Sequence, residues 1–153
     1  VALMESLAGA GMLTGGLLVA LMAPRRPVRW ILLGFAASCT ALALTALVPQ
    51  NLFGIAVVWW VISGITFVLG DAPLIALLQT TVPNHLQGRV LSLMSTIMVL
   101  AAPVGLALTA SLGEWVGVRG IFIAAGVAGT VASLAGLLSA SLRSLDQRPQ
   151  HRE

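Results

Sequence analysis

Between Arg29 and Asp71 the chain runs for 41 residues without a charged side chain. Further uncharged runs cover residues 6–24, 90–113 and 120–142. Backbone N–H and C=O groups cannot be left unpaired in hydrocarbon, so each run has to close its hydrogen bonds within itself as a helix. A helix of ~20 residues is long enough to cross a bilayer. The chain is therefore expected to be all-α, a polytopic bundle of transmembrane helices.

The composition excludes an ordinary water-soluble domain. Hydrophobic residues make up 58% of the chain and charged residues 8%, with a mean hydropathy of +1.01, whereas a globular domain is roughly 25% charged. All eight basic residues are arginines, and they do not form the single patch that a nucleic-acid partner would require. The expected partner is the lipid bilayer, and no nucleic acid.

Proline, polar and charged residues divide the apolar sequence into five segments. The breaks fall at 23–27, 49–51, 83–89 and 113–119. The sequence thus predicts five spans, at about 2–23, 28–48, 52–82, 86–113 and 117–143, and a polar tail at 144–153.

The distribution of arginine predicts the orientation, because basic residues in short loops stay on the cytoplasmic side. Seven of the eight arginines fall in segments on one side of the predicted bundle, and only Arg119 falls on the other side. We therefore expect a multi-pass protein of the inner (cytoplasmic) membrane with its N-terminus outside and its C-terminus in the cytoplasm. The seven arginines assigned to the cytoplasmic side are Arg25, Arg26, Arg29, Arg89, Arg143, Arg148 and Arg152.

Asp71 is the one charge well inside a predicted span, where a carboxylate costs ~2.5–3.5 kcal/mol on insertion scales. It either faces an aqueous cavity as a proton-coupling or cation-recognising group, or caps a helix that restarts at Gly70-Asp71-Ala72-Pro73. Glu5, near the outer end of the first helix, either reaches the headgroups or enters a cavity. Thr66 either lines the same path or bonds locally.

Enzymatic and metal-binding functions find no support in the residue pattern. Neither histidine lies in a predicted helix where it could activate a serine, no phosphate-binding loop is present, and no His/Cys/carboxylate cluster has metal-ligand spacing. No catalytic residue, cofactor or metal is expected. Small residues instead predict close helix packing, in three stripes: Gly11 and Gly15; Ala101, Gly105, Thr109 and Gly113; and Ala132, Gly136 and Ala140.

Residues 80–90, TTVPNHLQGRV, resemble a family connector in which Val-Pro and polar residues precede Gly-Arg at the start of the next helix. In the major facilitator superfamily this is the cytoplasmic connector between helices 10 and 11, in the branch of enterobactin-type and related drug exporters. The element Pro103-Val104-Gly105 is similar to the proline-glycine element of the following helix. Gly11 and Gly15, followed by Arg25-Arg26, are similar to helix 8 and its basic loop. The chain departs from the pattern at Gln87, where the family often has an arginine, and in lacking an aspartate in the basic loop.

The resemblance covers essentially the whole chain and implies a partial major facilitator fold, helices 8–12 of twelve. It further implies a fragment of a secondary transporter that works by alternating access, most simply a proton-coupled exporter of small amphipathic molecules, drug-like or siderophore-like. Its partners would be a small-molecule substrate, protons and the missing N-terminal half. Two alternatives stay open: an importer, and a self-standing five-helix scaffold or accessory subunit without transport activity.

Overall fold

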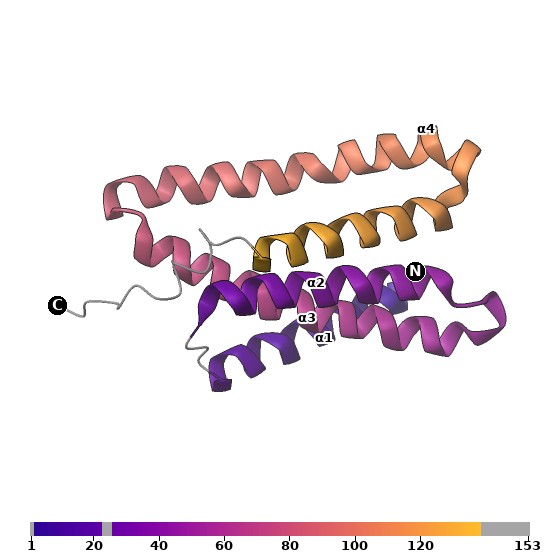
Figure 1. Cartoon of the computed structure of the whole chain (residues 1–153), viewed down its shortest axis with the longest axis horizontal. Coiled ribbons are helices and arrows are strands. Elements are labelled where there is room, and N and C mark those ends of the chain that lie inside the picture. The colour runs from indigo at the N-terminus through magenta and orange to yellow at the C-terminus, as the bar shows by residue number, and fades with distance from the viewer. Residues whose placement is uncertain (1, 23–25, 139–153) are drawn as a thin grey trace.

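The computed structural model describes residues 2–22 and 26–138, and this part of the chain is entirely helical apart from short connectors. Four α-helices follow one another: α1 (Ala2–Met22), α2 (Pro27–Leu47), α3 (Phe53–Thr81) and α4 (Asn84–Leu138). A single 3₁₀ turn, η1 (Gln50–Leu52), leads into α3. Figure 1 shows the helices running roughly along one direction, with α4 doubling back on itself.

Helix boundaries follow the prolines in the sequence. Pro27 occupies the first turn of α2, where its missing N–H is no loss, and Pro49 and Pro83 follow the ends of α2 and α3. Three predicted ranges, 2–23, 28–48 and 52–82, therefore agree with α1, α2 and α3 to within one residue. Three helices, α2, α3 and α4, are long and apolar enough to cross a membrane, and α1 is apolar over the shorter stretch Ser6–Met22.

The fourth predicted break, at 113–119, lies within the element α4. The element α4, of 55 residues, covers the predicted range 86–113 and residues 117–138 of the next range. Residues 139–143 are outside the described residues. The direction of α4 reverses at Gly117, which has φ 76° and ψ 149°, a conformation that glycine adopts without a steric cost. The non-helical conformation of Gly117 divides α4 into two helical arms that run in opposite directions, so the fourth predicted break is present, and a single residue makes it. We name 84–116 the first arm of α4 and 118–138 its second arm.

Packing centres on α2 and α3. Helix α2 packs against both α3 and α4, and α1 packs against α3. In Figure 1 the second arm of α4 lies beside α2, whereas the first arm runs apart from the other helices. Every side chain from residue 95 to residue 108 is exposed, with Val99 at 68% and Leu106 at 73%. The first arm therefore lacks a packing partner among the described residues.

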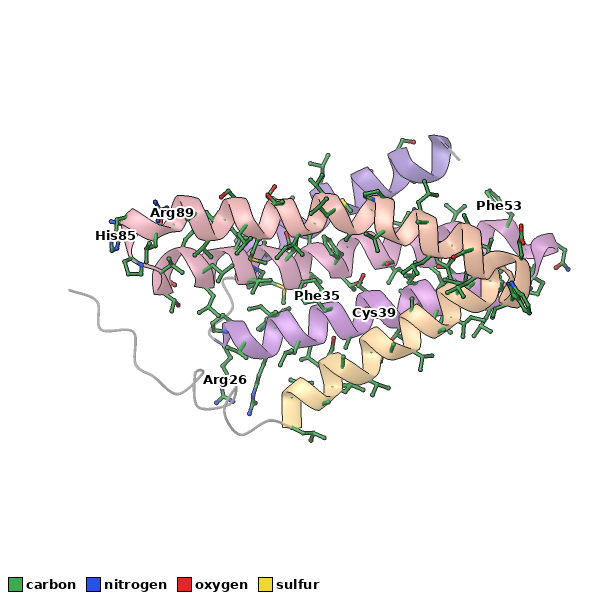
Figure 2. The ribbon with its side chains drawn as sticks, turned by 90° about the horizontal axis from the view of Figure 1, so that it is seen from above. Arg26, Phe35, Cys39, Phe53, His85 and Arg89 are labelled. Carbon is green, nitrogen blue, oxygen red and sulfur yellow. The ribbon has the colours of Figure 1, made fainter. Side chains whose placement is uncertain are left out.

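The connectors alternate between the two ends of the bundle. Arg26, His85 and Arg89 lie at one end of the long axis and Phe53 lies at the other (Figure 2). The connectors near Arg26 and Arg89, which were predicted to share one side of the membrane, are therefore at the same end of the molecule. The predicted tail, 144–153, is outside the described residues.

Candidate functional site

Asp71 lies in the interior of α3, ten residues before the helix ends at Thr81. The side chain is half-buried, and its Oδ1 atom is buried without a hydrogen-bond partner among the described residues. Because an unpaired carboxylate is costly in a low-dielectric environment, a position such as this one in a membrane helix points to a functional role. Asp71 is therefore the first candidate for the site.

The neighbour of Asp71, Gly70, lies where α3 crosses α2 almost backbone to backbone. A Cβ atom added to Gly34 of α2 would lie 2.5 Å from the Gly70 nitrogen, and one added to Gly70 would lie 3.0 Å from the Ile31 carbonyl oxygen. One turn away, the rings of Phe35 and Phe67 meet edge to face, with 5.7 Å between their centroids. This close contact between α2 and α3 fixes the position of Asp71 along the long axis of the bundle.

The interpretation of Asp71 as the cap of a restarting helix is wrong. Helix α3 is continuous from Phe53 to Thr81, so no N-terminus occurs at Asp71. Pro73 stands inside the helix and is buried. Since proline has no N–H, the carbonyl group of Leu69 loses its usual helical donor at this point.

Thr66, another candidate for the pathway, is not brought to Asp71. The Thr66 hydroxyl donates to the carbonyl oxygens of Ile62 and Ser63 in its own helix, at 2.8 Å and 3.2 Å. Five residues along a helix correspond to a rotation of about 140°, so Thr66 and Asp71 leave α3 on different faces. Glu5 belongs to α1, but its side chain is outside the described residues.

The small residues predicted for packing have different surroundings. Gly11 and Gly15 of α1 lie against α3, where added Cβ atoms would be 2.9 Å from the Val61 carbonyl oxygen and 2.7 Å from that of Ile65. Pro103 and Gly105, on the first arm of α4, are exposed, and nothing lies within 4 Å of a Cβ added to Gly105. The stripe containing Gly105 is therefore open on the molecular surface.

The second arm of α4 packs on α2 through two glycines outside the predicted stripe of Ala132, Gly136 and Ala140. That contact uses Gly126 and Gly129, whose added Cβ atoms would lie 2.7 Å from the Cys39 carbonyl oxygen and 2.5 Å from its Sγ atom. Beside them the hydroxyls of Thr40 and Thr130 are 3.1 Å apart. Ala132 is exposed, and Ala140 is outside the described residues.

The arginines of the family pattern lie on the surface of one end of the bundle. Arg26 and Arg89 are exposed, and Arg25 is outside the described residues. Gln87, the residue that departs from the pattern, folds back onto α3: its Nε2 atom donates to the carbonyl oxygens of Gln79 (2.5 Å) and Val82 (3.2 Å). The amide thereby satisfies carbonyl groups at the end of α3 that have no helical donor.

The polar contact between α2 and α3, like that of Thr40 with Thr130, was not predicted from the sequence. The Ser38 hydroxyl of α2 lies 3.0 Å from the Ser63 carbonyl oxygen, and the Ser63 hydroxyl lies 3.2 Å from the Ser38 carbonyl oxygen. A serine in the middle of each of two neighbouring apolar helices is the signal that could have revealed the pair. The Ser63 hydroxyl is therefore engaged with Ser38. In the part of the chain that the structure describes, no group of three His, Cys, Asp or Glu side chains could hold a metal ion.

Comparison with known proteins gives a family for this arrangement. The model of the Major Facilitator Superfamily matches residues 1–153. Macrolide efflux protein A of Streptococcus pyogenes is 34% identical over 118 residues, which are 76% of this chain and 29% of that protein. Multidrug efflux pump Tap of Mycolicibacterium fortuitum is 33% identical over 69 residues, 45% of this chain and 17% of that protein.

A third relative covers more of the chain. The MFS-type transporter YfiS of Bacillus subtilis (strain 168) is 32% identical over 141 residues, 88% of this chain and 32% of that protein. No solved structure matches the chain. The chain therefore spans about a third or less of the length of the curated relatives it matches.

Proposed function

The chain belongs to the major facilitator superfamily, and on this basis we propose that it is part of a proton-coupled exporter of small amphipathic molecules. Members of this family are multi-pass membrane transporters of small molecules rather than enzymes, and this chain is distantly related to drug efflux pumps. The names of two relatives, a macrolide efflux protein and a multidrug efflux pump, support export over import and an amphipathic, drug-like substrate.

The observation that carries the proton-coupling part of this proposal is the isolated carboxylate of Asp71. A charged carboxylate is stabilised where water reaches it, and its protonated form tolerates closed, dry surroundings. Proton release at Asp71 would therefore favour the conformation of the transporter in which water reaches this side chain. Proton uptake would favour the conformation in which the side chain is shielded from water. This is the coupling that alternating access requires.

The proposed partner of the chain is the N-terminal half of the same transporter. The first arm of α4 exposes Ala101 and Gly105, followed one turn later by the half-buried Thr109, and this part of α4 has no neighbouring helix among the described residues. Such small residues let a second helix approach closely. A self-standing scaffold would leave this stripe open to lipid. We propose accordingly that α1, α2, α3 and the two arms of α4 form five spans equivalent to helices 8–12 of a twelve-helix fold.

A transport assay tests this function. The full-length gene product that contains the chain is reconstituted in vesicles with an imposed proton gradient, and the movement of a macrolide is followed. We expect macrolide movement against its own gradient that stops when a protonophore collapses the proton gradient. A vesicle preparation with the 153-residue chain alone is the control and should not transport. Macrolide movement that ignores the protonophore would contradict proton coupling, and transport by the chain alone would contradict the need for a second half.

The proposed orientation can be tested separately with single cysteines in a Cys39→Ser background. Arg26 and Asn51 are both exposed, in connectors at opposite ends of the bundle. Because arginine-rich short loops stay in the cytoplasm, Arg26→Cys should react with a membrane-impermeant maleimide only in inside-out vesicles. Asn51→Cys, the matched control, should react only in intact cells. If Arg26→Cys reacted only in intact cells and Asn51→Cys only in inside-out vesicles, the proposed orientation would be wrong.

A further inference from the structure

One side chain bridges the joint between α3 and the first arm of α4. Gln87, in the first turn of the arm, is half-buried, and its Nε2 atom lies within hydrogen-bond distance of three oxygen atoms. These are the carbonyl oxygens of Gln79 (2.5 Å) and Val82 (3.2 Å) and the Oδ1 atom of Asn84 (3.2 Å). A side-chain amide has two N–H groups to donate. Gln87 therefore ties the start of α4 to the end of α3.

The two carbonyl groups that Gln87 reaches have lost their backbone donors. The carbonyl group of Gln79 would accept from the residue four positions ahead, but this is Pro83, which has no N–H. The carbonyl group of Val82 would accept from Leu86, whose N–H instead donates to the Pro83 carbonyl oxygen at 2.8 Å. The amide of Gln87 thus supplies the hydrogen bonds that the proline removes from this joint.

Packing between α3 and the first arm of α4 does little to set the angle between them. The two elements α3 and α4 make few contacts, and every side chain from residue 95 to residue 108 is exposed. In Figure 1 the first arm accordingly runs apart from the other helices. Because so few apolar atoms meet, dispersion contacts hold the arm only weakly. The hydrogen bonds of the joint therefore have a large share in fixing the angle.

The other end of the first arm is joined to an anchored helix. Beyond Gly117 the second arm packs on α2, and the Nη2 atom of Arg119 donates to the Val48 carbonyl oxygen at the end of α2, at 3.0 Å. That carbonyl group also lacks its helical donor, because the N–H of Leu52 donates to the Pro49 carbonyl oxygen. The first arm is thus a helix with a fixed far end, a turn at a single glycine, and a hydrogen-bonded near end.

We propose that Gln87 is a latch that holds the first arm of α4 at its present angle to α3. When the hydrogen bonds of its amide to Gln79 and Val82 break, the arm tilts between its two joints, the Val82-Pro83 connector and Gly117. One or two hydrogen bonds of modest net strength shift such an equilibrium by roughly 10-fold. The latch therefore favours one position of the arm but can be opened during a conformational change.

A distance measurement between the two helices tests the latch without any need for transport. The full-length gene product is prepared with all native cysteines, including Cys39, replaced by serine, and nitroxide labels are attached at Ile75→Cys of α3 and Leu93→Cys of the first arm, both exposed positions. Double electron–electron resonance then gives the distribution of label distances. Gln87→Glu keeps the length of the side chain but has no N–H to donate. We expect this variant to increase the ratio of a longer distance to the original one by roughly 10-fold.

The matched control is Gln79→Glu, the same change on an exposed side chain whose backbone carbonyl group alone takes part in the latch. It should leave the distances unchanged. Gln87→Arg retains N–H donors and should keep the original distance, whereas Gln87→Ala removes the donors without adding a charge and should behave like Gln87→Glu. The proposal is overturned if both Gln87→Glu and Gln87→Ala keep the original distances, or if Gln79→Glu or Gln87→Arg changes them as much as Gln87→Glu does.

Discussion

Replacing Asp71 by asparagine is expected to abolish proton-driven transport by the full-length protein without loss of folding. Asparagine keeps the size and shape of the side chain but cannot release a proton. The rate of substrate movement against its gradient should therefore fall at least about 10-fold, equivalent to an increase of ~1.4 kcal/mol or more in the activation free energy. Stability should stay the same or rise, since removal of a half-buried, unpartnered charge in α3 relieves a cost of up to ~2.5–3.5 kcal/mol. Transport is measured in proteoliposomes, and stability by equilibrium unfolding in mixed micelles.

Two further variants sharpen the Asp71 experiment. Asp71→Glu retains a titratable group and should keep measurable coupling. Thr66→Val removes a hydroxyl that bonds only within its own helix, so transport should remain near that of the unmodified protein. If Asp71→Asn pumps substrate as well as the unmodified protein does, the proposed role of this carboxylate in coupling is refuted. Equal loss in Asp71→Asn and Thr66→Val would indicate a general disturbance of α3.

Gly34→Leu is expected to cause the largest loss of stability in the chain. A Cβ atom at Gly34 would lie 2.5 Å from the nitrogen and 2.7 Å from the Cα atom of Gly70, and backbone atoms cannot move aside as a flexible side chain can. Helices α2 and α3 must separate, which costs about 3 kcal/mol or more and outweighs the ~1 kcal/mol that leucine gains in helix propensity. The measurement is the free energy of unfolding in mixed micelles.

Gly54→Leu is the matched control for Gly34→Leu. Gly54 also lies in a membrane helix, but nothing is within 4 Å of a Cβ added there. Its unfolding free energy should change by no more than about 1 kcal/mol. Equal effects of the two substitutions would mean that the tight crossing of α2 and α3 does not contribute to stability.

Some features of the site could be read from the residue pattern and others could not. Asp71 was identifiable because a single carboxylate in a long apolar run is conspicuous in any arrangement of helices. The pairing of Ser38 with Ser63 was not identifiable, because serines are common in membrane helices and their partners depend on how each helix is rotated. The same applies to the second arm of α4, where Gly126 and Gly129 make close contacts with α2 that no pattern in the sequence indicates.

The residue pattern alone indicates that the chain lies in a membrane, that its apolar segments are helical, and where α1, α2 and α3 begin and end. Hydrocarbon forces the backbone into helices, and prolines and charges mark their limits. The tertiary structure was needed to show that α2 and α3 cross at Gly34 and Gly70, that α3 passes Asp71 without a break, and that the second arm of α4 packs on α2. The physical reason is that these helices are apolar on all sides, so no amphipathic stripe in the sequence shows which face meets a neighbour.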